Sequence, residues 1–176
     1  RGLGDVYKRQ EQSGINEALF GEVDEKVKSL PLFGISKKIY KGEIFPPESD
    51  DFVSDDNLFN YQAKIIKEVA AEESCVIIGR CADYILRENP ALVRVFVLGD
   101  TEAKIKRTAE REGISEEKAK IRMEQADKRR KYFHNTHSEN KWGDSRSYDI
   151  TVNSSKLGLD STAELLIKYI ELRNAE

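Results

Sequence analysis

The chain has 176 residues, of which 39% are hydrophobic and 35% are charged, and its formal net charge at pH 7 is −3. This length is sufficient for one domain with a sizeable core, and the composition is typical of globular proteins rather than of disordered or membrane-embedded ones. The negative net charge argues against a general nucleic-acid binder. No apolar run approaches the roughly 18 residues of a membrane span, so we expect no membrane partner and a cytoplasmic location.

Residues 1–10 have no helical or strand periodicity and resemble translated adapter sequence, so we treat them as a non-native segment. Gly2, Gly4 and Lys8 suggest a phosphate loop. However, the required Gly-x-x-x-x-Gly-Lys-[Ser/Thr] spacing is absent, and no strand can precede these residues. We therefore expect residues 11–176 to form a single domain.

The first part of that domain is predicted to be helical and then irregular. Ser13 can cap one helix, and Asp56 or Asn57 opens a second, each followed by apolar residues at helical spacing. Between them, residues of about 30–55 are rich in Gly, Pro, Ser and Asp. So long a connection in a compact domain is typical of a functional flap or a disordered loop, and we expect it to be mobile.

Three apolar runs predict strands at Cys75–Ile78, Leu92–Leu98 and Tyr148–Asn153. Continuous apolar runs are typical of strands that helices bury on both faces. The spacing also predicts helices at Ala82–Arg87, from Thr101, from Ser115 through Phe133, and from Asp160, the last of which is expected to bury Ala163, Leu166, Ile167 and Ile170. This order of elements predicts an α/β fold in three layers, a parallel sheet with helices on both faces.

Arg80 follows the first of these strands, directly after Gly79. Ligands bind at the carboxyl ends of the strands in open α/β sheets, and the planar guanidinium of arginine matches a phosphate. One hypothesis is therefore that this strand delivers Arg80 to a phosphate. The alternative is that Gly79 only ends the strand and that Arg80 is a solvated residue at a helix start. The strand and its flanking residues do not favour either hypothesis.

A basic segment, Lys128–Lys131, lies between the second and third predicted strands. A run of charge on a helix is usually a solvated face, but at this place a helical lid of about residues 114–146 could close over a ligand. Asp127 and Arg130 are three residues apart, so they share a helical face and can pair. Phosphoryl transfer chiefly needs positioning and charge neutralisation, which convergent arginines and Mg²⁺ can supply.

The cysteines and histidines do not indicate a metal site. Cys75 and Cys81, without recurring metal-type partners, indicate free thiols in a reducing compartment. The neighbouring Arg80 could lower the pKa of the Cys81 thiol, but no histidine and asparagine arrangement supports a nucleophile. His134 and His137 could form half of a metal site, yet acidic or cysteine partners do not recur at ligand spacing. We interpret them as two surface histidines.

Taken together, these motifs give the chain a recognisable pattern. The chain resembles the cytidylate kinase-like family, a branch of the P-loop nucleoside monophosphate kinases. The resemblance covers about Gln10 to the C-terminus in unbroken order. It rests on Cys75–Leu86, on Arg94–Val97 with Arg107, on Asp127–Arg130 with Tyr132, on Lys141–Asp144, and on Tyr148–Gly158.

The resemblance implies transfer of the γ-phosphate of ATP to CMP or dCMP, assisted by Mg²⁺ for which no protein ligand is identified. It assigns Arg80 to the acceptor's monophosphate and Asp83 to the nucleoside. Asp127 and Arg130 become lid residues, with Arg130 reaching the transferred phosphate, and Arg107 lies near the donor nucleotide. The implied partners are small nucleotides; the oligomeric state stays open.

Two departures from the family pattern matter. Glu124 and Gln125 stand where relatives often have basic lid residues, which weakens the positive field of the lid. The family's first strand and phosphate loop are not found, and in this fold that strand lies between those of Val76 and Val95. We therefore expect an N-terminally incomplete kinase domain with little or no activity. One alternative is a non-catalytic module that binds a phosphate ligand or a partner, and a less favoured one is a nucleic-acid binder using Lys128–Lys131.

Overall fold

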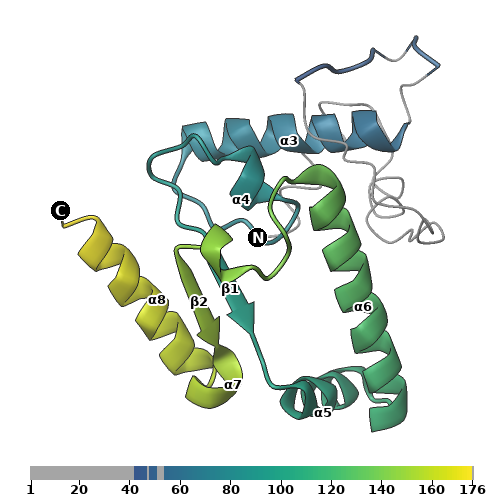
Figure 1. Cartoon of the computed structure of the whole chain (residues 1–176), viewed down its shortest axis with the longest axis vertical. Coiled ribbons are helices and arrows are strands. Elements are labelled where there is room, and N and C mark those ends of the chain that lie inside the picture. Colours follow the sequence, from purple (N-terminus) through teal and green to yellow (C-terminus); the bar gives the residue numbers. More distant parts are fainter. Residues whose placement is uncertain (1–41, 47, 51–53, 176) are drawn as a thin grey trace. The chain divides into compact units, whose positions relative to one another are not determined.

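The computed structural model describes residues 42–46, 48–50 and 54–175 (Figure 1). Residues 1–10, interpreted as non-native, the helix predicted from Ser13 and most of the predicted mobile loop lie outside the described residues. The chain divides into two compact units. Unit 1 comprises the chain up to Leu92 together with Arg129–Trp142, and unit 2 comprises Val93–Lys128 and Gly143–Glu176. Each unit is described by itself.

Unit 1 is built on the helix α3, Asp55–Glu72. The Ser54 hydroxyl caps the helix by accepting a hydrogen bond from the main-chain N–H of Asn57, at 3.2 Å. Asp55 and Asp56 occupy the first turn, where negative charge complements the helix dipole. The predicted second helix is therefore confirmed, with its start about one residue earlier. Its buried residues are Asn57, Leu58, Phe59, Tyr61, Gln62, Ala63, Ile65 and Ile66.

The core of unit 1 forms where the short helix α4, Ala82–Ile85, packs against α3 (Figure 1). Phe59, Ala63 and Ile66 of α3 meet the buried side chains of α4 and of Cys81, and Phe133 packs against this cluster. Burying large apolar side chains in this way contributes about 1.5–3 kcal/mol for each. The cluster thus fixes α4 and the turn before it.

The prediction of a strand at Cys75–Ile78 is wrong. None of its residues belongs to a strand in the described part of the chain, and the side chains of Val76 and Ile78 are 92% and 88% exposed. Ile77, between them, packs against the unit 1 core. A strand buried on both faces needs hydrogen-bonded neighbours as well as covering helices, and within unit 1 the described residues offer no such neighbour.

Unit 2 contains a parallel pair of strands, β1 (Val95–Leu98) and β2 (Ile150–Asn153). The register pairs Val95 with Ile150 and Leu98 with Asn153. The second and third predicted strands are thus confirmed in shorter form, and the small parallel sheet with its helices is compatible with an α/β fold. Within the described residues the sheet has two strands, and the three-layer arrangement lacking the first strand and the phosphate loop stays a prediction.

Unit 2 also contains helices, and one of them continues into unit 1. The helix α5, Thr101–Glu112, ends at Gly113, whose φ of +63° suits a glycine. The following helix, α6 (Glu116–His137), passes from unit 2 into unit 1 at Arg129. The remaining helical elements are the 3-10 turn η1 (Ser145–Ser147), α7 (Ser154–Leu157) and α8 (Leu159–Arg173). No helix in the described ranges is long and apolar enough to cross a membrane.

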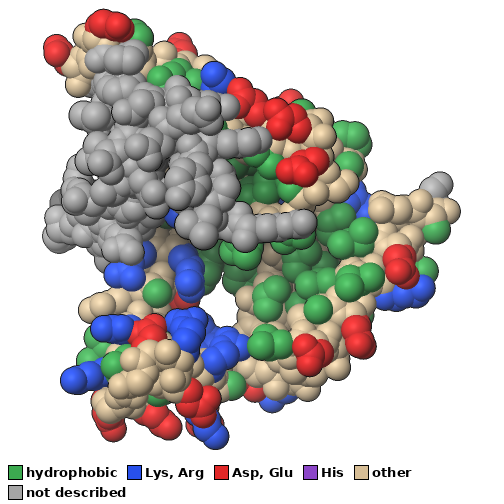
Figure 2. Space-filling view, turned by 180° about the vertical axis from the view of Figure 1, so that it is seen from behind, with side chains coloured by type: hydrophobic (Ala, Val, Ile, Leu, Met, Phe, Trp, Pro, Cys, Tyr) green, Lys and Arg blue, Asp and Glu red, His purple; other side chains and the backbone are tan. Residues whose placement is uncertain are grey.

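The closing helix α8 begins at Leu159, one residue before the predicted Asp160, and the predicted burial of its apolar residues is wrong. Ala163 is exposed, Ile167 and Ile170 are 57% and 40% exposed, and Leu166 is half-buried. Thr162 is its one buried residue. Figure 2 shows hydrophobic side chains exposed over α8, and lysines and arginines gathered over α5 and the adjoining part of α6. Helical periodicity locates an apolar face but does not supply the surface that covers it.

Candidate functional site

The turn that carries Arg80 has an unusual backbone. Gly79, Arg80 and Cys81 have φ angles of +73°, +57° and +56°. Glycine adopts this left-handed region freely, whereas each of the other two residues is destabilised there by about 1–2 kcal/mol. Such conformations persist only where the surroundings enforce them, and they cluster at functional sites. Here the buried Cys81 side chain and the hydrogen bond from Ala82 N to Gly79 O, at 3.1 Å, hold the turn.

The Cys81 thiol is a packing group and not a reactive one. It is 2% exposed, and burial, with a smaller effect of the Asp83 charge, raises its pKa far above the usual range. The lowering considered from the neighbouring Arg80 is therefore not found. A thiol that stays protonated is a poor nucleophile and a poor metal ligand. Cys75, by contrast, is exposed.

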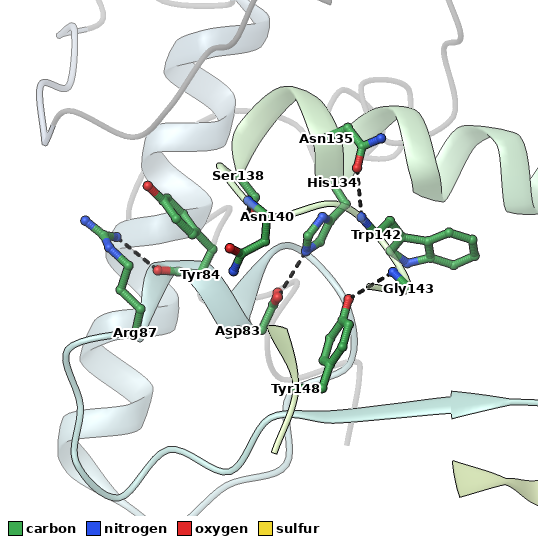
Figure 3. A network of polar contacts seen from close by, with 10 residues as sticks. All are labelled: Asp83, Tyr84, Arg87, His134, Asn135, Ser138, Asn140, Trp142, Gly143 and Tyr148. Atoms are coloured by element: carbon green, nitrogen blue, oxygen red, sulfur yellow. Dashed lines mark hydrogen bonds and ion pairs between the residues drawn. The ribbon is translucent and has the colours of Figure 1, made fainter. Parts of the chain in front are cut away.

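Asp83 and His134 form the central polar contact of unit 1 (Figure 3). Asp83 lies on α4, three residues after Arg80, and His134 lies near the end of α6. The His134 Nε2 atom is 3.0 Å from the Asp83 Oδ2 atom. The histidine side chain is 8% exposed and that of Asp83 is 18% exposed, so both are largely shielded from water. This contact joins α4 to α6 across 51 residues of sequence.

The interpretation of His134 and His137 as surface residues is wrong, because they are 6% and 5% exposed. The His137 ring stacks on Phe59, with ring centroids 4.0 Å apart and an interplanar angle of 14°. Among the described residues, no group of three or more His, Cys, Asp or Glu side chains could hold a metal ion. The histidines act as packing and hydrogen-bonding groups.

Tyr84 anchors α4 on a different side from Asp83 (Figure 3). Its side chain is buried, and burial is the main cause that raises the pKa of its phenol. The Arg87 guanidinium lies 4.3 Å from the centre of the tyrosine ring and donates to the Tyr84 carbonyl oxygen at 3.0 Å. These contacts fix the rotation of α4, and with it the direction in which Asp83 points.

The predicted lid residues fall in different units. Arg130 is exposed on the unit 1 part of α6, one helical turn before His134. Asp127 lies on the unit 2 part, and its carboxylate Oδ2 is 2.5 Å from the Lys104 Nζ of α5. The side chains of Asp127 and Lys104 are 26% and 28% exposed, respectively. Lys104 is thus a partner of Asp127 that the sequence reasoning missed.

Arg107, assigned to the donor nucleotide by the resemblance, is exposed on α5 in unit 2. The structure therefore places Arg80, Asp83 and Arg130 in unit 1, and Asp127 and Arg107 in unit 2. In unit 1 it brings Asp83 against His134, which was missed as a functional residue. The available signal was weak: His134 lies four residues after Arg130 and so shares its helical face.

A second cluster of polar side chains lies at the carboxyl ends of β1 and β2 in unit 2. The Asp100 carboxylate accepts a hydrogen bond from the Asn153 side chain at 2.8 Å and pairs with the Lys156 ammonium at 2.9 Å. The Asn153 hydrogen bond, followed by that from Lys156, lowers the pKa of Asp100. The Ser155 hydroxyl accepts from the Asp100 main-chain N–H at 3.0 Å. These contacts close the loops after both strands.

The comparisons with known proteins agree with the resemblance seen in the motifs. The model of the family described as the cytidylate kinase-like family matches residues 6–156. A crystal structure of an uncharacterised protein from Eubacterium ventriosum is 44% identical, with a TM-score of 0.64 over 69% of this chain and 77% of that one. Among curated proteins, none matches the chain. Since the family match extends over most of the sequence, the chain belongs to the cytidylate kinase-like family.

Proposed function

We propose that this protein is a nucleoside monophosphate kinase unit whose family reaction transfers the γ-phosphate of ATP to CMP or dCMP, and that this chain turns over slowly or not at all, because no phosphate-loop motif is found in its sequence. The family supports kinase-type chemistry. The observation that carries the proposal is the contact of Asp83 with His134, because it joins the turn of Arg80 to the segment of α6 that bears Arg130. Arg80, Asp83 and Arg130, which we assign to the acceptor phosphate, the nucleoside and the transferred phosphate, belong to one unit.

Arg80 is the proposed ligand of the acceptor's monophosphate. Its guanidinium presents several N–H donors in a planar fork, which suits two phosphate oxygens at once. The left-handed turn holds its backbone in one conformation, so less entropy is lost on binding. Asp83 is the proposed acceptor of a hydrogen bond from the nucleoside, since a carboxylate can only accept.

Arg130 is the proposed lid residue that reaches the transferred phosphate, Asp127 is a second proposed lid residue, and Arg107 is proposed for the donor nucleotide. Phosphoryl transfer depends on positioning and on neutralising charge on the transferred group, which is the role proposed for Arg130. Asp127, paired with Lys104, holds α6 against α5 within unit 2. Mg²⁺ usually binds through substrate phosphates and few protein carboxylates, so we propose that it enters with ATP. Once bound, it neutralises charge on the phosphates of ATP.

Titration calorimetry of the chain with CMP, dCMP, AMP and inorganic phosphate tests the acceptor class. We expect CMP or dCMP to bind most tightly and Arg80→Ala to weaken that binding about tenfold or more, the size of one charged hydrogen bond. Arg146→Ala is the matched control, because Arg146 is an exposed arginine of unit 2 paired with Asp144. An unchanged affinity in Arg80→Ala contradicts the proposal.

A coupled assay of ADP release with ATP, Mg²⁺ and CMP or dCMP tests the expected low activity. Turnover comparable to that of an intact nucleotide kinase contradicts that expectation. Binding of inorganic phosphate as tightly as CMP supports the non-catalytic alternative instead.

A further inference from the structure

We propose that His134 is a positioning residue for Asp83: its Nε2–H holds one carboxylate oxygen so that the other faces the acceptor nucleoside. The inference rests on the proposed function and deepens it by naming the residue that orients its nucleoside-binding group. Asp83 and His134 belong to the same unit, and the Nε2 to Oδ2 distance of 3.0 Å is that of a hydrogen bond.

The surroundings of the imidazole decide which nitrogen carries the proton. His134 Nδ1 is buried and has no hydrogen-bond partner among the described residues. A buried N–H without an acceptor is destabilising, and a carboxylate can only accept a hydrogen bond. Placing the proton on Nε2 meets both conditions, because Nε2 then donates to Asp83 and Nδ1 carries a lone pair. The burial of Nδ1 therefore selects the tautomer that donates to Asp83.

Aromatic contacts of Phe133 and His137, which lie before and after His134 in the sequence, fix the position of the imidazole. Phe133 meets Phe59 edge to face, with centroids 5.9 Å apart, and His137 stacks on the same ring. Both contacts attach the end of α6 to α3. Since His134 is 6% exposed, it has little room to turn away from Asp83. The donor is thus preorganised before any ligand binds.

The carboxylate of Asp83 retains capacity for a ligand. A carboxylate has two oxygens and about four lone-pair sites, and His134 binds Oδ2. The side chain stays 18% exposed, so Oδ1 can still accept a hydrogen bond from a nucleoside hydroxyl or amino group. Without His134 the carboxylate could rotate, and its conformational entropy would then be lost when the ligand binds, which lowers the affinity.

Two matched variants test this role. In His134→Gln the amide nitrogen reaches the place of Nε2, whereas in His134→Asn the amide is one methylene shorter and ends near the place of Nδ1. Ile65→Val controls for stability, because Ile65 is fully buried on α3 but is not a member of the cluster that contacts α4 and Phe133. The measurements are the Kd for CMP by calorimetry and the midpoint of thermal unfolding.

We expect His134→Asn to weaken CMP binding about tenfold and His134→Gln to stay within about threefold of the parent, the difference of one hydrogen bond to a charged group. Ile65→Val is expected to lower the unfolding midpoint and leave the Kd for CMP within about twofold. The nitrogen-15 spectrum of His134 is expected to show the proton on Nε2. A proton on Nδ1 alone overturns the proposal.

Other outcomes separate this inference from the proposed function. If the parent binds CMP and both histidine variants bind it equally well, His134 has no positioning role although the proposed function stands. If Ile65→Val weakens binding as much as His134→Asn, the effect is one of stability, and the inference is overturned. If the parent binds no nucleoside monophosphate, the proposed function fails and this role for His134 fails with it.

Discussion

The carboxylate of Asp149 accepts hydrogen bonds from both the side chain and the main chain of Arg94. It accepts from the Arg94 guanidinium at 2.8 Å and from the Arg94 main-chain N–H at 2.7 Å, just before the paired strands β1 and β2 begin. The side-chain hydrogen bond from Arg94 is the main cause that lowers the pKa of Asp149. The pair thus aligns the two strands at the start of their parallel register.

This pair predicts a specific dependence of stability on pH. Because the pKa of Asp149 is lowered in the folded state, its contribution is fully present above the unfolded-state value of about 3.9. It is lost as the pH falls through the lower folded-state pKa. Asp149→Asn is expected to reduce the free energy of unfolding at pH 7 by about 1–2 kcal/mol, a value reduced for partial exposure to solvent.

Urea unfolding of the parent and of Asp149→Asn at neutral pH and at about pH 3 checks this prediction. The difference between the two proteins is expected to shrink on acidification. Glu164→Gln, an exposed carboxylate of α8, is the control with no expected effect beyond about 0.5 kcal/mol. A difference that does not change with pH contradicts the assigned role of the carboxylate.

The left-handed turn predicts an inverted ranking of glycine and alanine at position 80. Both Arg80→Gly and Arg80→Ala remove the guanidinium, but only glycine relieves the strain of a φ of +57°. Arg80→Gly is therefore expected to be more stable than Arg80→Ala by about 1 kcal/mol, while both bind CMP weakly. In an ordinary helix the order is the reverse. Chemical unfolding compares the two variants, and greater stability of Arg80→Ala refutes the strained turn.

Gly79 provides an independent check of the same turn. Its φ is +73°, and a Cβ placed there meets nothing within 4 Å. Any loss of stability in Gly79→Ala therefore reflects backbone conformation and not a clash. We expect a loss of about 1 kcal/mol in the free energy of unfolding.

The two cysteines are predicted to differ sharply in reactivity. The thiol of Cys75 is exposed, whereas burial raises the pKa of Cys81 and shields it. A thiol reagent at mildly alkaline pH is expected to modify Cys75 quickly and Cys81 only on unfolding. Cys75→Ser is expected to abolish the fast phase, whereas Cys81→Ala is expected to preserve it. Rapid labelling of the folded Cys75→Ser variant contradicts the buried position of Cys81.

The ion pair of Lys104 and Asp127 is predicted to couple α5 and α6 within unit 2. Both side chains are partly shielded, so we expect a coupling free energy of about 1 kcal/mol. A double-mutant cycle with Lys104→Met and Asp127→Asn, measured by urea unfolding, determines it. The coupling is expected to fall at high salt, because added ions screen such a pair. Strictly additive effects in the cycle show that the pair does not stabilise the packing of the two helices.

The sequence by itself determined features that depend on neighbours along the chain. Asp56 or Asn57, followed by apolar residues at helical spacing, placed the start of α3 to within about one residue, and the apolar runs around Val95 and Ile150 located both paired strands. The order of motifs also identified the family. These signals are local: hydrogen bonds at a helix start and the periodicity of apolar residues act within a few positions.

Only the tertiary structure decided which groups meet and which are covered. Val76 and Ile78 have the composition of a buried strand, yet they are exposed because burial requires partner surfaces that an apolar run does not provide. Asp83 and His134 are 51 residues apart, and Lys104 and Asp127 are 23 apart. Such pairs depend on how helices pack, and the packing is set by the sum of many weak contacts between distant residues.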